Sequence, residues 1–130
     1  MIFVDTNYFL RFLLKDHAEH KDRARELFED GADGKVDLCT STIVFFEIYW
    51  VLTSFYGKQK GDTVRILEDV LAMAFIMVPE RERLRKALRF FAESAFDLED
   101  SYNLIFAQEY RVRTFETFDK TLAKRFASFA

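Results

Sequence analysis

The chain's most informative chemistry is a carboxylate placed where a predicted strand ends. Residues 1–4 are apolar, and the sequence then changes abruptly to Asp5, Thr6 and Asn7. A helical apolar pattern follows, so this run predicts a strand, a turn and a helix, with Asp5 at the carboxyl end of a buried strand. In open α/β sheets, ligands bind at that edge.

Glu47 stands in the otherwise apolar segment 43–51, which has helical spacing. Most faces of such a helix would bury this carboxylate, and burying it unpaired costs several kcal/mol. It therefore needs a basic partner, such as Arg11, or a metal ion. The metal is the favoured interpretation once the other acidic residues are considered.

Three further Asp residues begin predicted helices. Asp97 and Asp100 lie at the start of one, and Asp119 follows a strand expected at 113–117. Asp is a favoured helix N-cap, so capping alone could explain Asp5, Asp97 and Asp119 taken singly.

Taken together, four carboxylates are expected at one edge of the sheet. Without a counterion they would repel one another, and some would take up protons. Mg²⁺ or Mn²⁺ removes that conflict, and ligands that are all oxygen argue against zinc. The four residues are Asp5, Glu47, Asp100 and Asp119.

Strands and helices are expected to alternate along the chain. The strands are predicted at 2–4, 36–39, 75–78 and 113–117. The helices are predicted at about 6–15, 19–30 (stopped by Gly31), 42–55, 63–72 (capped by Asp62), 80–93, 98–110 and 119–126. This order predicts an α/β/α sandwich with three layers and a central, mostly parallel sheet of four or five strands, forming a single domain over 1–130.

The composition and charge of the chain limit which partners and locations are expected. The net charge of −3 provides no general attraction to nucleic acid, so local basic residues and metal ions would have to supply it. No apolar run approaches the ~20 residues of a membrane span. The N-terminus lacks the features of a signal peptide, and we expect a cytoplasmic protein with no membrane partner.

The ordered acidic residues resemble the motifs of the PIN-domain nucleases, and within them the small VapC-type toxins. Asp100 matches the family's third principal acid, and Asp97 matches an auxiliary one. The likeness covers nearly the whole chain, at the segments 2–7, 41–47, 96–101 and 117–120.

The resemblance implies hydrolysis of phosphodiester bonds, usually of RNA, with Mg²⁺ or Mn²⁺. It implies a metal held by Asp5, Asp100, Asp119 and Glu47, the last also orienting water or acting as general base. It implies a toxin with a small antitoxin partner, working as a homodimer. The supporting residues, which would hold the carboxylates or a phosphate oxygen, are Thr6, Asn7, Asp97 and Thr117.

Two departures from the family pattern are visible. Ser101 stands where small toxins often carry Ala, and the chain ends at Ala130, where family members usually add a fifth strand.

The basic residues of 80–93 favour a solvated charged face. Four basic residues on helices that start at the acidic edge are better placed to bind RNA phosphates: Arg11, Lys15, Lys120 and Lys124.

Other functions remain open at this point. A non-catalytic PIN-like module that binds RNA or a protein is the main alternative, although such a module need not keep repelling carboxylates. A haloacid dehalogenase-type phosphotransferase would need a second Asp where Asn7 stands. A receiver domain would need paired acids at the end of the first strand, and Thr6 follows Asp5.

Overall fold

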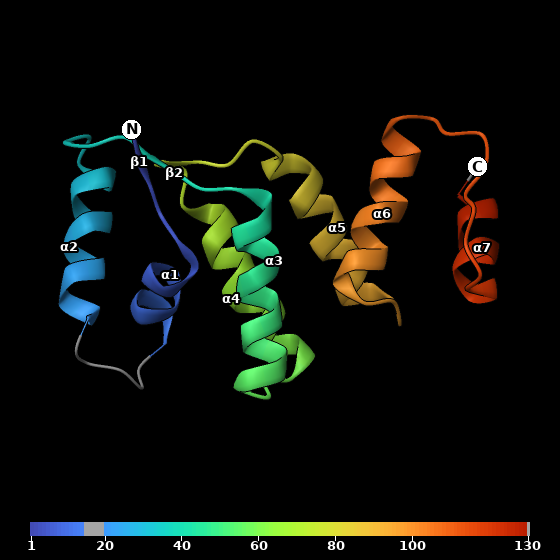
Figure 1. Ribbon diagram of the computed structural model, residues 1–130, viewed down its shortest axis with the longest axis horizontal. Helices are drawn as coiled ribbons and strands as arrows, with labels where there is room; N and C mark the ends of the chain where they lie inside the picture. The colour runs from blue at the N-terminus through green and yellow to red at the C-terminus, as the bar shows by residue number, and fades with distance from the viewer. Residues whose placement is uncertain (15–19, 130) are drawn as a thin grey trace. The chain divides into compact units, whose positions relative to one another are not determined.

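A computed structural model describes residues 1–14 and 20–129. The chain forms two compact units, Met1–Arg81 and Glu82–Ala130, which we call the N-terminal and C-terminal units and describe separately. The elements in chain order (Figure 1) are β1 (Ile2–Phe3), α1 (Thr6–Leu13), α2 (Lys21–Ala32), β2 (Leu38–Cys39), α3 (Thr42–Trp50), the π-helix η1 (Val51–Phe55), α4 (Lys60–Ala72), β3 (Ile76–Met77), α5 (Arg81–Glu93), α6 (Leu98–Glu109) and α7 (Lys120–Ala127).

The N-terminal unit is built around a parallel sheet in the order β1-β2-β3. Ile2 is in register with Leu38, and Leu38 with Ile76. The predicted α/β class with parallel strands is therefore confirmed. The expected burial of the first strand is wrong, because Ile2 and Phe3 are exposed on a strand that pairs on one side only within the described residues.

The strand expected at 113–117 is absent from the described structure, which contains three strands. The segment has a bend at Arg113 and no regular secondary structure after it, and Arg113, Thr114 and Glu116 are exposed. Its one large apolar side chain, Phe115, packs on Phe126 of α7, with ring centroids 5.2 Å apart. In this segment, local aromatic packing takes the place of strand pairing. The three-layer arrangement and the single domain over 1–130 remain predictions.

An aromatic seam joins α1 to α2. The Phe28 ring lies 5.4 Å from that of Phe9 and meets Phe12 edge-on at 4.9 Å.

Gly31 also lies on α2, and a Cβ there would come within 2.5 Å of the Leu38 side chain. The expectation that Gly31 stops the helix is wrong, because α2 continues to Ala32 and the glycine instead permits close approach to β2.

Two other helices differ from their predicted form. Asp62 does not cap α4, which begins at Lys60; it lies in the first turn and pairs with Arg65. The long helix predicted to Phe55 changes to a π-helix after Trp50. The Thr53 hydroxyl donates to the Tyr49 carbonyl at 2.9 Å, a side-chain bond that competes with the regular helical ladder.

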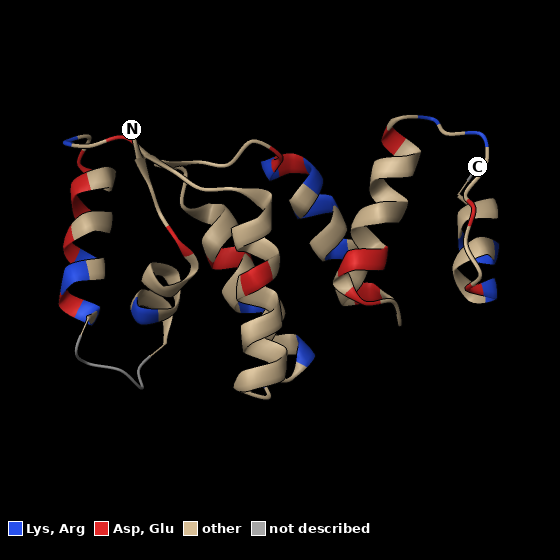
Figure 2. Ribbon diagram, viewed as in Figure 1, with Lys and Arg blue, Asp and Glu red and all other residues tan. Residues whose placement is uncertain are grey.

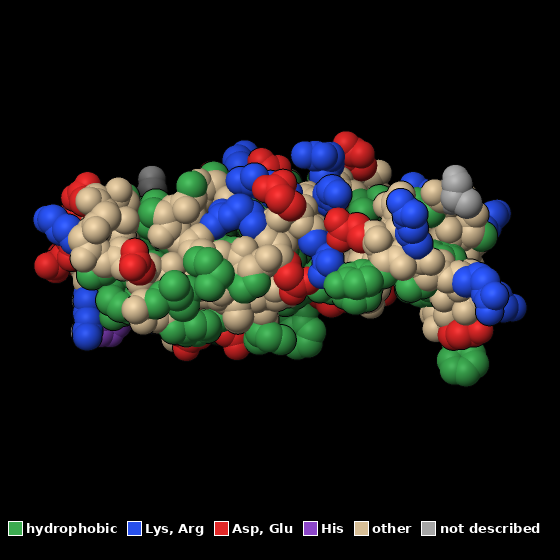
Figure 3. Space-filling model, turned by 90° about the horizontal axis from the view of Figure 1, so that it is seen from above, with side chains coloured by type: hydrophobic (Ala, Val, Ile, Leu, Met, Phe, Trp, Pro, Cys, Tyr) green, Lys and Arg blue, Asp and Glu red, His purple; other side chains and the backbone are tan. Residues whose placement is uncertain are grey.

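The surface of the N-terminal unit carries large apolar side chains. Ile43 and Phe55 are each 76% exposed, and Trp50 is 60% exposed. Figure 3 shows hydrophobic side chains, in green, on the face of the molecule that it draws. No helix among the described residues has both the length and the apolar character needed to cross a membrane.

Aromatic contacts connect α7 to the end of α5 in the C-terminal unit. The Phe90 ring stacks on Phe96 at 6.0 Å and meets Phe129 edge-on at 5.5 Å. The Arg125 guanidinium lies over the Phe129 and Phe90 rings, at 4.7 and 5.1 Å. These contacts fix the position of α7 within this unit, and with it the position of its first turn.

Candidate functional site

Asp5 follows β1 and is the N-cap of α1. Its Oδ1 accepts a hydrogen bond from the Thr6 backbone N–H at 2.8 Å. Its Oδ2 accepts none from the residues that the structure describes. The capping interpretation is confirmed, but capping uses only one oxygen of an exposed carboxylate and leaves the other available to a cation.

Glu47 lies near Asp5 because Thr6 donates a hydrogen bond to each of them. The buried Thr6, which directly follows Asp5, donates its hydroxyl to Glu47 Oε1. Ser41 caps α3 by accepting from the Val44 backbone N–H at 3.3 Å, which starts the helix that presents Glu47. The N-terminal unit thus brings Asp5, Thr6 and Glu47 together.

The expected burial of Glu47 is wrong. The side chain is exposed rather than buried, because it shares the outer face of α3 with Ile43 and Trp50. The alternative partner considered for Glu47, Arg11, forms no ion pair with it among the described residues. The partner of Glu47 is a neutral hydroxyl, and no described basic residue forms an ion pair with it.

Asp97 is the N-cap of α6, as predicted. Its Oδ1 accepts from the Asp100 backbone N–H at 2.8 Å. The buried Ser101 donates its hydroxyl to the Asp97 carbonyl at 2.7 Å, so this serine stabilises the turn that carries both acids.

Asp119 is the N-cap of α7, again as predicted. Its Oδ1 accepts from the Leu122 backbone N–H at 3.0 Å, and no described residue donates to its Oδ2. Thr117 Oγ1 accepts from the Asp119 backbone N–H at 3.1 Å. Thr117 therefore holds the backbone from which the Asp119 carboxylate projects.

The acids of the C-terminal unit interact through their charges. The pKa of Asp100 is raised by partial burial, then by the negative charges of Asp97 and Asp119. Figure 2 shows acidic positions, in red, at the start of α6 and before α7. A cation placed among these acids would remove the repulsion that raises this pKa.

The donor chemistry fits a hard divalent cation. Asp5 and Asp119 each keep one oxygen that no described residue occupies, and carboxylate oxygens are the ligands that Mg²⁺ prefers. No group of three or more His, Cys, Asp or Glu within the described residues has the arrangement of a complete metal site. Convergence of Asp5, Glu47, Asp100 and Asp119 stays a prediction.

The predicted basic residues lie in different settings. Lys120 and Lys124 are exposed on α7, while Lys15 lies outside the described residues. Arg11 and Asn7 line a hollow in the N-terminal unit together with residues that sequence reasoning did not assign to RNA binding: Tyr8, His20 and Arg23.

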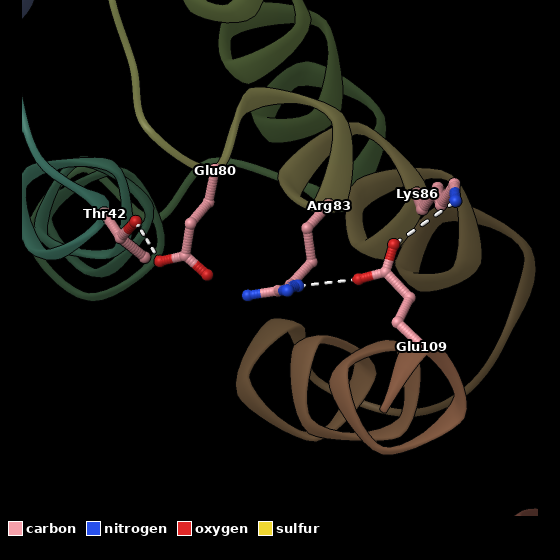
Figure 4. Close-up of polar contacts among 5 residues, drawn as sticks. All are labelled: Thr42, Glu80, Arg83, Lys86 and Glu109. Carbon is pink, nitrogen blue, oxygen red and sulfur yellow. Dashed lines mark hydrogen bonds and ion pairs between the residues drawn. The ribbon is translucent and has the colours of Figure 1, made fainter. Parts of the chain in front are cut away.

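The charged helix α5 exposes Arg85, Lys86 and Arg89, as predicted, but Arg83 is partly buried. Glu109 accepts from Arg83 Nε at 2.6 Å and from Lys86 Nζ at 3.3 Å (Figure 4). Arg83 is only 19% exposed and lies 4.8 Å from the Phe106 ring centre. The Arg83 hydrogen bond, followed by that of Lys86, lowers the pKa of Glu109. Within the N-terminal unit, Figure 4 also shows Thr42 donating to Glu80 at 2.5 Å.

The chain is an α/β protein with a parallel sheet, with a carboxylate at a strand end and further carboxylates at helix starts. The PIN domain family matches residues 2–127, so the chain belongs to that family. Its members are typically metal-dependent nucleases and usually bind Mg²⁺ or Mn²⁺. No curated protein matches the chain in sequence.

Proposed function

We propose that this protein is an endoribonuclease that hydrolyses RNA phosphodiester bonds with Mg²⁺ or Mn²⁺. The observation that carries the proposal is the pairing of Asp5 with Glu47 through Thr6, in a chain of a nuclease family. Asp5 and Asp119 each offer a carboxylate oxygen that no described residue occupies, and the repulsion around Asp100 favours a cation.

Each acidic residue has a separate part in this proposal. Asp5, Asp100, Asp119 and Glu47 would hold the cation. When bound, Mg²⁺ or Mn²⁺ would lower the pKa of water and offset charge on the phosphate that is attacked. Glu47 would accept the proton of the attacking water, with Thr6 fixing its orientation through the hydroxyl.

We also propose that the protein is the toxin of a type II toxin–antitoxin pair and acts as a homodimer. The exposed Ile43, Trp50 and Phe55 support an interaction with other protein chains, because large apolar side chains on a surface often mark interfaces. Size-exclusion chromatography with light scattering would measure the oligomeric state. Induced expression in a bacterial host would measure toxicity, with Asp5→Asn as the matched control.

The decisive experiment is cleavage of a mixed RNA pool by the purified protein and by Asp5→Asn, each with Mn²⁺ and with EDTA. Cutting by the wild type alone, and only with Mn²⁺, is expected. Equal cutting by both proteins would show that the site assignment is wrong. No cutting, together with retained RNA binding, would favour the non-catalytic binding module instead.

A further inference from the structure

A hollow of about 300 Å³ lies between α1 and the start of α2. The described residues that line it all have side chains that can donate hydrogen bonds, and none of these described residues is acidic: Asn7, Tyr8, Arg11, His20 and Arg23. Two guanidinium groups, an amide, a phenol and an imidazole surrounding one small volume form a site suited to an oxyanion.

The aromatic seam of the N-terminal unit fixes the two walls of this hollow. Phe9 and Phe12 of α1 pack on Phe28 of α2, so the helices cannot slide apart without breaking these contacts. Tyr8 and Arg11 are three positions apart on α1 and therefore share a face next to the seam. The hollow is thus held by buried packing rather than by its own polar residues.

The two arginines of the hollow have no acidic partner among the described residues. Arg11 and Arg23 form no ion pair with any described residue. The acid next to Arg23 on α2, Asp22, is engaged by Arg25 at 2.9 Å. Figure 2 shows the basic positions on α1 and at the start of α2, and Figure 3 shows a histidine, in purple, beside a basic side chain at this end of the unit.

We propose that this hollow binds a phosphate of the RNA backbone a short distance along the strand from the bond that is cut. This inference rests on the proposed nuclease function. Arg11 lies six positions beyond Asp5, about 9 Å along the helix axis at 1.5 Å per residue. A guanidinium binds two phosphate oxygens at once, so Arg11 and Arg23 would clamp the phosphodiester while Asn7 and Tyr8 donate to its remaining oxygens.

The test uses a labelled single-stranded RNA of mixed sequence in EDTA, so that binding is measured without cutting. The double variant Arg11→Gln/Arg23→Gln is expected to bind about 10-fold or more weakly. The slope of log K against log salt should fall by about 0.7 for each phosphate that the variant no longer neutralises. The control, Lys35→Gln/Arg65→Gln, removes the same charge from exposed positions of the same unit and should leave both quantities near wild type.

Equal affinities and salt slopes for the two double variants would overturn the proposal. Circular dichroism checks folding. Independently of any variant, inorganic phosphate added to the wild-type protein should shift the backbone amide signals of Tyr8, Arg11 and Arg23 in NMR spectra, and unchanged signals would also count against the site.

Other outcomes separate this inference from the proposed function. RNA binding that depends on Arg11 and Arg23, in a protein that cuts no RNA with Mn²⁺, would support the subsite and reject the nuclease. Cutting by the wild type with control-like binding by the double variant would reject the subsite alone. Tighter binding of an Asp/Glu-rich peptide than of RNA, abolished in the same variant, would overturn the RNA assignment.

Discussion

The two units hold their acidic residues in different ways. In the N-terminal unit, Thr6 supplies a donor to each acid, its backbone N–H to Asp5 and its hydroxyl to Glu47. In the C-terminal unit, Asp100 is partly buried among the charges of other acids, and its pKa is raised. Hydrogen bonds position the acids of both units, but the C-terminal group also retains a repulsion that protons or a cation would relieve.

The largest expected effect separates catalysis from stability at Asp100. Asp100→Asn should lower RNA cleavage by about 10³-fold, since it removes a charge from the proposed metal site. The same change should raise the melting temperature of the metal-free protein at pH 7 by about 2 °C, because repulsion is removed. Cleavage assays and thermal unfolding in EDTA measure the two quantities.

The pH dependence of that stabilisation checks its cause. Because burial and neighbouring charges raise the pKa of Asp100 in the folded protein above its ordinary value of 3.8, the ionised side chain is unfavourable at neutral pH. As the pH falls through the raised pKa, Asp100 takes up a proton and the advantage of Asp100→Asn should disappear. A constant difference down to pH 4 would contradict repulsion as the cause.

The next largest effect is stabilisation by metal. Mn²⁺ should stabilise the wild-type protein by about 2.7 kcal/mol when free metal exceeds the Kd by about 100-fold. Asp119→Asn should lose most of this gain because its free oxygen is a proposed ligand. Asp33→Asn, an exposed acid that follows α2, is the matched control. Equal metal stabilisation of both variants would exclude Asp119 from the site.

The features that could be predicted from sequence are local ones. Asp97 and Asp119 cap helices through backbone N–H groups only three residues away, so residue type and spacing sufficed. The expected strand at 113–117 failed because a strand depends on a distant pairing partner, and Phe115 found a nearby partner in Phe126 instead.

The same distinction applies to the candidate site. The identity of each acid was visible in the sequence, but the hydrogen bond between Thr6 and Glu47 joins positions 41 apart and was not. The hollow was missed because Arg11 and Arg23 come together only through packing around Phe28. The only local indication of the hollow in the sequence was the helical spacing of Tyr8 and Arg11, which places both side chains on one face of α1.

A smaller effect tests how Thr6 positions the N-terminal acids. Thr6→Val should lower the free energy of unfolding by about 1–2 kcal/mol, because Glu47 loses its hydroxyl donor. It should also lower the rate of RNA cleavage, because the Glu47 carboxylate is no longer oriented by that hydrogen bond. Thr63 is a matched control in the same unit, since its buried hydroxyl has no hydrogen-bond partner in the described structure. Thr63→Val should be neutral or stabilising in urea unfolding. Equal losses for both variants would reject a specific role for Thr6.

The smallest effect concerns an acid of the C-terminal unit that already has cations beside it. Glu109 accepts from Arg83 and Lys86, so its pKa is lowered rather than raised. Glu109→Gln should therefore destabilise the protein by roughly 0.5 kcal/mol at pH 7, opposite in sign to Asp100→Asn. Because the folded pKa lies below the ordinary value of 4.5, this contribution is present above pH 4.5 and is lost as the pH falls through the folded pKa. Urea unfolding at pH 7 and pH 3 measures the change. A stabilising effect of Glu109→Gln at pH 7 would mean that nearby cations do not distinguish these two carboxylates.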